Sequence, residues 1–126
     1  MYSYTDLDIY TISMDLVVEI YRLTADFPGH EQYGLSSQMR RSAVSIPSNI
    51  AEGSGRQSTK EFIRYLYVSN GSLSELETQL DIARRLNYID DTTDFIKNIK
   101  RVRTMLMHLI KSLKARNNQD NELSNE

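Results

Sequence analysis

Hydrophobic residues recur along the chain at steps of three and four positions, the spacing that places side chains on one face of an α-helix. No segment shows the sustained apolar–polar alternation that is typical of a half-buried strand. The pattern is interrupted by turn-forming residues at 26–31, 53–58 and 87–94. It predicts four helices, at about residues 6–26, 36–53, 59–86 and 92–115. Because short connections make successive helices antiparallel neighbours, the expected fold is an all-α, up-down-up-down four-helix bundle over residues 1–116.

The first predicted helix carries more apolar surface than one bundle face needs. One stripe contains Leu7, Tyr10, Met14, Val17 and Tyr21. A second stripe lies about 100° around the helix and contains Ile9, Ile12, Leu16, Ile20, Leu23 and Phe27. Since a bundle helix usually has a narrower stripe, we expect the surplus to contact another copy of the chain. The sequence therefore predicts an oligomer interface at Ile9, Leu16, Ile20 and Leu23.

The inner faces of the next two predicted helices follow clear repeats. The second has Leu35, Met39, Ser42 or Ala43, Ile46, Ile50 and Gly53. The third has a heptad seam of Phe62, Leu66, Ser69, Leu73, Leu76, Leu80 and Ala83, which favours the shallow left-handed crossing of a bundle. The small residues Ser69 and Gly71 would allow a neighbouring backbone to approach closely. Ser58 followed by Glu61 is a capping box for the start of this helix.

The ends of the first and fourth helices are predicted from caps and from loss of periodicity. Thr5 with Asp8 can cap the first helix, and Asp91 or Thr92 can cap the fourth. The fourth helix has an apolar seam of Phe95, Ile99, Val102, Leu106, Leu109 and Leu113. Residues 117–126 have no apolar periodicity, and we predict that they form a disordered tail.

Composition narrows the classes of function. A chain of 126 residues suits one domain. Because it contains no cysteine, it can form neither a disulfide nor a thiolate nucleophile, and it cannot hold a metal through cysteine. No secretory signal and no apolar run near the roughly 18 residues of a membrane span is present. We therefore expect a cytoplasmic protein with no membrane partner.

Charge is segregated along the chain, although the total is only −2. Residues 1–31 hold six acids and one Arg, whereas residues 92–116 hold seven basic residues and one Asp. A candidate nucleic-acid patch on the fourth helix, whose phosphate contacts would be weakened by salt, consists of Lys97, Lys100, Arg101, Arg103, Lys111 and Lys114, with Arg116 beyond them. The alternative is a solvated outer face, or one that is neutralised by the acidic first helix.

The sequence offers no recognisable catalytic or metal motif. A di-metal bundle needs Glu-x-x-His pairs, but neither His30 nor His108 has an acid three residues upstream. We interpret His108 as a partly buried structural residue. The glycines at 53–55 do not fit a phosphate-binding loop, and the serines fall at caps and helix contacts rather than in a nucleophile elbow. We therefore expect no metal or other cofactor and no enzymatic activity.

One polar stretch, SIPSNIAEG at 45–53, interrupts the apolar face of the second helix. Pro47 lacks an amide hydrogen, so it frees the carbonyl of Ala43 and should kink the helix. Asn49 could bond the freed backbone, and Glu52 could pair with Arg56 or with a basic residue of another helix. We predict a structural polar cluster, made of Arg41, Pro47, Asn49, Glu52 and Arg56. The alternative is a small-ligand or catalytic site around the same charged and amide groups.

These residues also carry a family resemblance. From Leu7 to Leu113 the chain closely resembles the four-helix-bundle family encoded in intervening sequences of bacterial 23S ribosomal RNA genes, which is sometimes labelled as ribosomal. The most specific matches are Phe27-Pro28 with Glu31, Tyr33-Gly34-Leu35, Gln38 with Arg40-Arg41, Ser45-Ile46-Pro47 with Asn49-Ile50-Ala51-Glu52-Gly53, Phe62, and Gly71-Ser72 with Glu75-Leu76.

The resemblance implies a homo-oligomer, typically a ring of five, with no established enzymatic activity. Accessory proteins of diversity-generating retroelements look distantly similar, and in them a basic ring contacts reverse transcriptase and RNA. This chain departs from them in being acidic overall. We expect a non-enzymatic, homo-oligomeric and pentameric scaffold or accessory protein that binds RNA or a protein partner, with the ligand site around Asn49 and Glu52 as the alternative.

Overall fold

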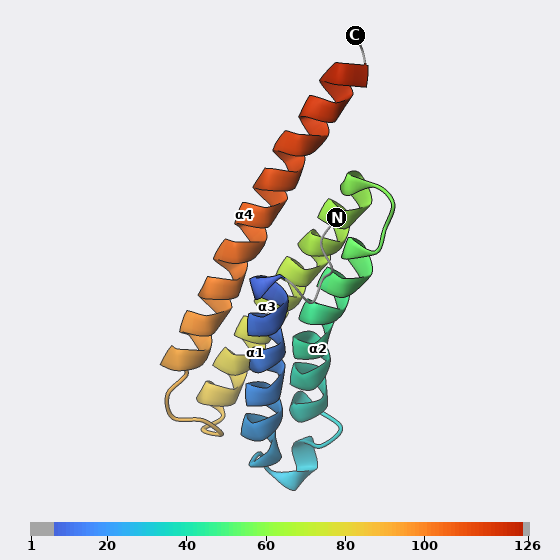
Figure 1. Cartoon of the computed structure of the whole chain (residues 1–126). Coiled ribbons are helices and arrows are strands. Elements are labelled where there is room, and N and C mark those ends of the chain that lie inside the picture. The colour runs from blue at the N-terminus through green and yellow to red at the C-terminus, as the bar shows by residue number, and fades with distance from the viewer. Residues whose placement is uncertain (1–6, 125–126) are drawn as a thin grey trace.

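The computed structural model describes residues 7–124, with side chains as far as residue 120. This part of the chain contains α-helices and one 3₁₀ turn, and no strand. The elements are α1 (Asp8–Ala25), η2 (Gly29–Glu31), α2 (Leu35–Ser54), α3 (Thr59–Arg85) and α4 (Thr93–Ser124). The four helices run alternately down and up (Figure 1). The all-α, up-down-up-down bundle predicted from the sequence is therefore confirmed.

Local side-chain chemistry explains where the later helices begin. The Ser58 hydroxyl accepts a hydrogen bond of 3.1 Å from the Glu61 amide, as the predicted capping box requires. At the start of α4, the Asp91 carboxylate accepts a hydrogen bond of 2.9 Å from the Thr93 amide. The predicted Thr5 cap and the predicted start of the first helix at residue 6 lie outside the described residues.

The core follows the predicted stripes closely. In α2 and α3 every predicted inner residue is buried except Phe62, which is half-buried. In α4 the buried residues are Ile99, Val102, Leu106, Ile110 and Leu113. Because the helix has 3.6 residues per turn, its buried face drifts away from the predicted seven-residue repeat. Ile110 therefore lies in the core, and the predicted Leu109 is only half-buried.

α2 and α3 form the most extensive helix pair of the bundle. At Gly53 the two backbones come so close that a Cβ would lie 2.6 Å from the Cβ of Tyr65. Ser69 is fully buried, and its hydroxyl donates a hydrogen bond of 2.9 Å to the carbonyl of Ile46. Gly71, by contrast, faces open space, so the prediction that it allows a close approach is wrong.

The predicted oligomer interface on α1 is wrong for three of its four residues. Ile9, Leu16 and Ile20 are only 4%, 1% and 0% exposed within the single chain, and Leu23 is half-buried against the same core. The other stripe faces outward only in part: Met14 and Tyr21 are 39% and 43% exposed, whereas Leu7, Tyr10 and Val17 are half-buried against the core. An apolar stripe marks a face that avoids water, but it does not say whether the partner is the same chain or another.

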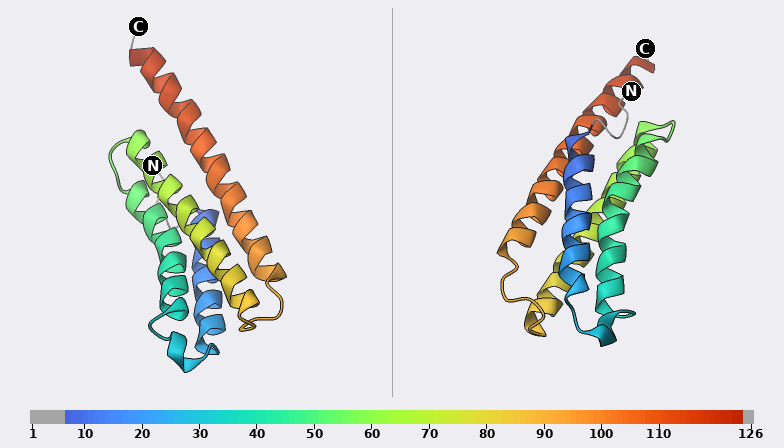
Figure 2. Two further views of the ribbon diagram at one scale, coloured as in Figure 1. Left: turned by 180° about the vertical axis from the view of Figure 1, so that it is seen from behind. Right: turned by 60° about the horizontal axis from the view of Figure 1, so that its bottom comes forward.

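α4 is longer than predicted. It continues to Ser124, and its final turns extend beyond the other three helices (Figures 1 and 2). The predicted helix end near residue 115 and the predicted disordered tail are therefore wrong over residues 117–124; residues 125 and 126 lie outside the described part. The segment has no apolar stripe, so the spacing of hydrophobic residues gave no signal for this part of the helix, although Ala115 and Arg116 before it and Gln119 within it are good helix formers.

Candidate functional site

The polar stretch around Pro47 forms an internal network between α2 and α3. α2 continues through the buried Pro47 as one helix. The Asn49 amide donates hydrogen bonds of 2.7 Å to the carbonyl and 2.9 Å to the hydroxyl of Ser45. The Ser72 hydroxyl of α3 donates to the same Ser45 hydroxyl at 2.8 Å. Asn49 thus bonds the carbonyl of Ser45 rather than that of Ala43, and the chain of bonds joins the two helices.

Glu52 lies at the turn that follows and takes no part in this network. Its carboxylate forms an ion pair with Arg56, as one of the predicted alternatives had it. The Arg56 guanidinium also donates a hydrogen bond of 2.6 Å to the Tyr65 hydroxyl and lies 5.0 Å from the centre of that ring. The pair is open to solvent, and it joins the end of α2 to the first turns of α3.

The structure does not bring the five predicted residues together. Arg41 is exposed and has only a weak contact of 3.4 Å with the Ser37 hydroxyl of its own helix. Asn49 belongs to the α2–α3 network, and Glu52 with Arg56 belongs to the turn. The geometry therefore assigns structural roles to Asn49 and to the Glu52–Arg56 pair, leaves Arg41 apart from both, and does not gather the five residues into a single ligand or catalytic site.

The basic residues of α4 separate into two groups. Lys97, Lys100, Arg101 and Lys111 are exposed, and their spacing puts them on one face of the helix, here called the basic face. His108 shares this face and is exposed, so its interpretation as a partly buried residue is wrong.

The other two predicted residues point toward α3. Arg103 forms an ion pair of 3.2 Å with Glu77 and donates a hydrogen bond of 3.3 Å to Asn70. The Lys114 ammonium donates a hydrogen bond of 2.8 Å to the Tyr67 hydroxyl and lies 5.2 Å from the centre of that ring. Arg103 and Lys114 therefore bind side chains of α3, unlike the cations of the basic face.

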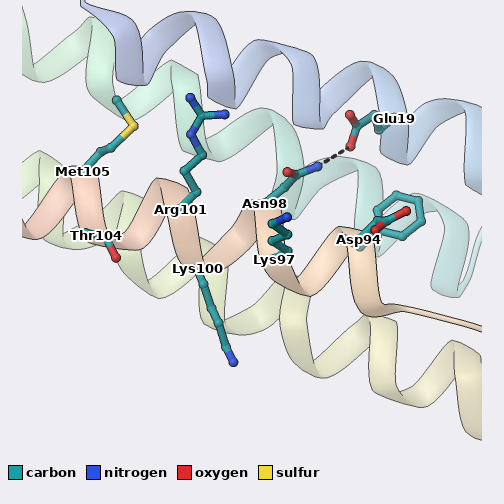
Figure 3. Close-up of a pocket in the computed structure, with 9 residues that line it drawn as sticks. Glu19, Asp94, Lys97, Asn98, Lys100, Arg101, Thr104 and Met105 are labelled. Atoms are coloured by element: carbon teal, nitrogen blue, oxygen red, sulfur yellow. Dashed lines mark hydrogen bonds between the residues drawn. The ribbon is translucent and has the colours of Figure 1, made fainter.

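A groove of about 910 Å³ runs along the basic face of α4 and reaches α1 at Glu19; the basic-face residues Lys97, Lys100 and Arg101 help to line it. Figure 3 shows Arg101 and Asn98 pointing toward α1, while Lys100, at the other edge of the basic face, points away from α1. The Asn98 amide donates a hydrogen bond of 3.3 Å to the Glu19 carboxylate. Within the described residues no ion pair joins α1 to α4, although one helix is acidic and the other basic. The acidic residues of α1 therefore do not neutralise the basic residues of α4 through ion pairs, as the alternative interpretation had proposed.

Sequence reasoning missed a polar cluster at the end of the bundle where two connections meet. The Tyr88 hydroxyl donates a hydrogen bond of 2.9 Å to Glu31, and the Nε2 atom of His30 lies 3.2 Å from the same hydroxyl. The other oxygen of Glu31 accepts a hydrogen bond of 3.2 Å from the Leu35 amide, which caps α2. The Tyr88 ring packs against Phe27 at 5.3 Å. No spacing rule joins residues 57 positions apart, so this contact had no signal in the sequence.

Hydrogen bonding sets the ionisation of this cluster. The Leu35 amide, followed by the Tyr88 hydroxyl, lowers the pKa of the Glu31 carboxyl. The same bond to Glu31 raises the pKa of the Tyr88 hydroxyl. The charged carboxylate and the neutral phenol therefore stabilise each other, and the cluster links the α1–α2 connection to the α3–α4 connection.

The described residues contain neither a cluster of metal ligands nor a membrane-spanning helix. No group of three or more His, Cys, Asp and Glu side chains gathers around a point where a metal ion could bind. No helix in the same part of the chain combines the length and the hydropathy that a membrane crossing requires.

Comparisons with known proteins place the chain in a family. No curated protein matches the sequence significantly. A crystal structure from Bacteroides thetaiotaomicron, described as a protein of unknown function from the S23 ribosomal protein family, matches with a TM-score of 0.59 and 24% identity. The match covers 85% of this chain and 95% of that one, and at this identity it shows a shared fold. Residues 5–108 match the family described as 23S rRNA-intervening sequence protein, and the chain belongs to that family.

Proposed function

We propose that this protein is a non-enzymatic, homo-oligomeric scaffold that binds RNA through the basic face of α4. The observation that carries the proposal is the contrast within one helix. Arg103 is paired with Glu77. Lys97, Lys100, Arg101 and Lys111 are exposed and form no ion pair with another described residue.

The spacing of these cations suits a polyanion. At 1.5 Å per residue, positions 97 to 111 cover about 21 Å along the helix, so several successive phosphates could be contacted at once. Such contacts release counterions, and they read charge rather than base sequence. Long, flexible lysines on a convex helix are also better suited to phosphates than to the buried core of a protein interface, where lysine is depleted.

The outward stripe of α1 supports self-association. Met14 and Tyr21 of this stripe, and Val18 next to it on α1, are each about two-fifths exposed, and Val44 of α2 lines a groove together with Met14. A groove of about 280 Å³ between these helices is lined mainly by apolar residues, which are Tyr10, Met14, Val17, Val44, Pro47 and Ala51, together with Ser48. Burying such surface is worth about 25 cal/mol per Å². The family resemblance noted from the sequence would make the assembly a ring of five.

Assembly and RNA binding reinforce each other in this proposal. Each added copy contributes another basic face, so contacts that are individually weak become strong through multivalency. The distant similarity to retroelement accessory proteins suggests a reverse transcriptase–RNA complex as one partner of this kind, in a cytoplasmic setting.

Salt-dependent binding tests the RNA part of the proposal. We expect the full chain to bind a labelled RNA hairpin at 50 mM salt and to lose affinity steeply by 200 mM. The variant Lys97→Gln/Lys100→Gln/Arg101→Gln/Lys111→Gln should flatten the slope of log K against log salt by about 1 for each residue. The matched control is Lys60→Gln/Arg64→Gln/Arg84→Gln/Arg85→Gln on α3, which removes the same charge. Equal losses in the two variants, or no binding at 50 mM salt, would contradict the proposal.

Light scattering after size-exclusion chromatography tests the assembly. The wild-type chain should elute as an oligomer at micromolar concentration, and Met14→Glu/Val18→Glu should elute as a monomer with unchanged helical content. Val68 and Ile82 of α3 are comparably exposed, so Val68→Glu/Ile82→Glu is the control and should remain oligomeric. A wild-type monomer would refute self-association, and dissociation of the α3 variant alone would place the interface elsewhere.

A further inference from the structure

A second groove, here called the tyrosine–arginine groove, lies where the α1–α2 connection meets the start of α2. Its volume is about 540 Å³, within the range of about 300 to 1,000 Å³ that is common for small-ligand sites. The residues that line it are Tyr21, Gln32, Tyr33, Ser37, Arg40, Arg41, Val44 and Ser45. These described residues include two tyrosines and two arginines but no Asp or Glu.

Arg40 is fixed in place by the helix next to it. Its Nε donates a hydrogen bond of 2.8 Å to the hydroxyl of Thr24, which is itself buried, and its Nη2 donates one of 3.3 Å to the carbonyl of Tyr21. The guanidinium lies 4.6 Å from the centre of the Tyr21 ring. These contacts orient the planar group at little further cost in entropy, and its Nη1 has no partner among the described residues.

Arg41 brings a second cation to the same groove. Among the described residues it bonds Ser37 alone, through a contact of 3.4 Å that is at the weak end of hydrogen-bond geometry. Two guanidinium groups on adjacent residues without an acidic partner in the groove form a local positive centre on a chain of net charge −2. Guanidinium donors match the oxygens of phosphate groups well.

Tyr33 is the most exposed large hydrophobic residue in the described part of the chain. It is 90% exposed, in the turn between η2 and α2. A solvent-exposed ring beside a cationic groove offers a face on which a nucleobase can stack, and such stacking tolerates any base. The same residue types are found in peptide-binding sites, but a peptide would leave the ring face and the paired cations less well matched than a nucleotide.

We propose that the tyrosine–arginine groove binds one nucleotide unit, with its phosphate at Arg40 and Arg41 and its base against Tyr33. The groove lies on the α2 side of α1, away from the basic face of α4. The site is therefore separate from the proposed RNA-binding face, and it adjoins the proposed self-association surface at Tyr21 and Val44. The unit has two sources, a free nucleotide or an unpaired residue of single-stranded RNA.

Calorimetric titration of the full chain with AMP, with adenosine and with a ten-nucleotide oligoadenylate tests this assignment. Tyr33→Ala should weaken binding of AMP or of the oligonucleotide about tenfold, whereas Tyr33→Phe should keep it within about twofold because the ring remains. Arg41→Gln should weaken AMP binding about tenfold and leave any adenosine binding unchanged. Since Tyr33 makes no packing contact worth preserving at 90% exposure, its variants should unfold at the wild-type temperature.

The arms of the experiment separate the two sources and the two proposals. If AMP binds and Tyr33→Ala weakens that binding, a free nucleotide is sufficient for the groove. If only the oligonucleotide binds, and Tyr33→Ala weakens its binding, the ligand is single-stranded RNA. The variant in which the four cations of the basic face are replaced by Gln should still show the Tyr33-dependent binding, whichever of the two ligands is found. If the oligonucleotide binds only through the basic face and Tyr33→Ala has no effect, the groove assignment is wrong while the proposed function stands. If neither AMP nor the oligonucleotide binds at millimolar concentration, the assignment is also wrong.

Discussion

The two flanks of this bundle differ in how closely their helices approach. Between α2 and α3 the contact residues are small or short, with Gly53, Ser69 and Ser72 at the crossing, and hydrogen bonds pass directly from one helix to the other. Between α1 and α4 the flanking residues are long, as Arg101 and Met105 show, and a groove remains. All four helices have apolar inner faces with the same period, so the residues beside the stripe determine whether a flank closes.

This difference separates stability from recognition. A closed flank excludes water and gains from every buried methylene. An open flank with charged edges contributes less to folding but leaves the basic face available to a partner. Substitutions in the α2–α3 flank should therefore change stability strongly, and equivalent substitutions near the α1–α4 groove should change it little.

The largest expected effect comes from one pair of identical substitutions. Leu76 of α3 is fully buried, so Leu76→Ala should lower the free energy of unfolding by about 2 to 5 kcal/mol. Leu109 of α4 is half-buried, so Leu109→Ala should cost only about 1 kcal/mol. Urea denaturation followed by circular dichroism measures both. Equal losses would mean that the two flanks are packed alike, and that the α1–α4 flank is not the more open one.

A pair of glycine substitutions tests the close approach itself. Gly53→Ala places a Cβ 2.6 Å from the Cβ of Tyr65 and 3.0 Å from a ring carbon of Phe62. The helices must move apart, and we expect a loss of about 1 to 3 kcal/mol.

Gly71→Ala is the matched control within the same helix pair. No atom lies within 4 Å of the added Cβ, so the change should stabilise α3 by about 0.5 to 1 kcal/mol through helix propensity. The two variants should thus shift the urea midpoint in opposite directions. A stable Gly53→Ala protein would show that the crossing is looser than this structure has it.

The sequence predicted the closed flank well because periodicity reports burial. Leu66, Leu73 and Leu80 are spaced so that only one helix face can contain them, and that face needs a partner. The capping box at Ser58 was also predictable, since its bonds are local. The extension of α4 was not, because a polar segment has no apolar stripe to detect.

The functional surfaces were predicted less well because they depend on which neighbour lies where. The two stripes of α1 are equally apolar in sequence, and only the position of α2 and α4 decides that Leu16 is core and Met14 is surface. In the same way, Arg103 and Arg101 are indistinguishable until Glu77 is seen beside one of them. Contacts such as Glu31 with Tyr88 depend entirely on how the connections meet.

A smaller effect should follow from the hydrogen bonds that cross the closed flank. Ser69→Ala removes the buried donor to the Ile46 carbonyl, and we expect a loss of about 1 kcal/mol. Ser112 of α4 is exposed, and Ser112→Ala should give no loss. Differential scanning calorimetry at neutral pH resolves such a difference. A Ser69→Ala protein as stable as the control would mean that helix–helix packing alone closes this flank.

The smallest expected effect concerns the cluster that fixes one end of the open flank, because its groups are accessible to solvent and therefore weakly coupled. Glu31 has a folded-state pKa below its ordinary value of 4.5, so its contribution to stability is present above that pH and disappears as the pH falls through the folded value. The stability difference between wild type and Glu31→Gln should accordingly be largest at pH 7 and should shrink below pH 4.5. Tyr88→Phe should retain part of the dependence, since the bond from the Leu35 amide remains, and Tyr33→Phe should retain all of it. Urea midpoints of the wild type and the variants, measured at pH 7, 5 and 3, give this dependence of stability on pH. Curves for wild type and Glu31→Gln that stay parallel at every pH would show that this end of the bundle is held by the Phe27–Tyr88 ring contact rather than by the charged carboxylate.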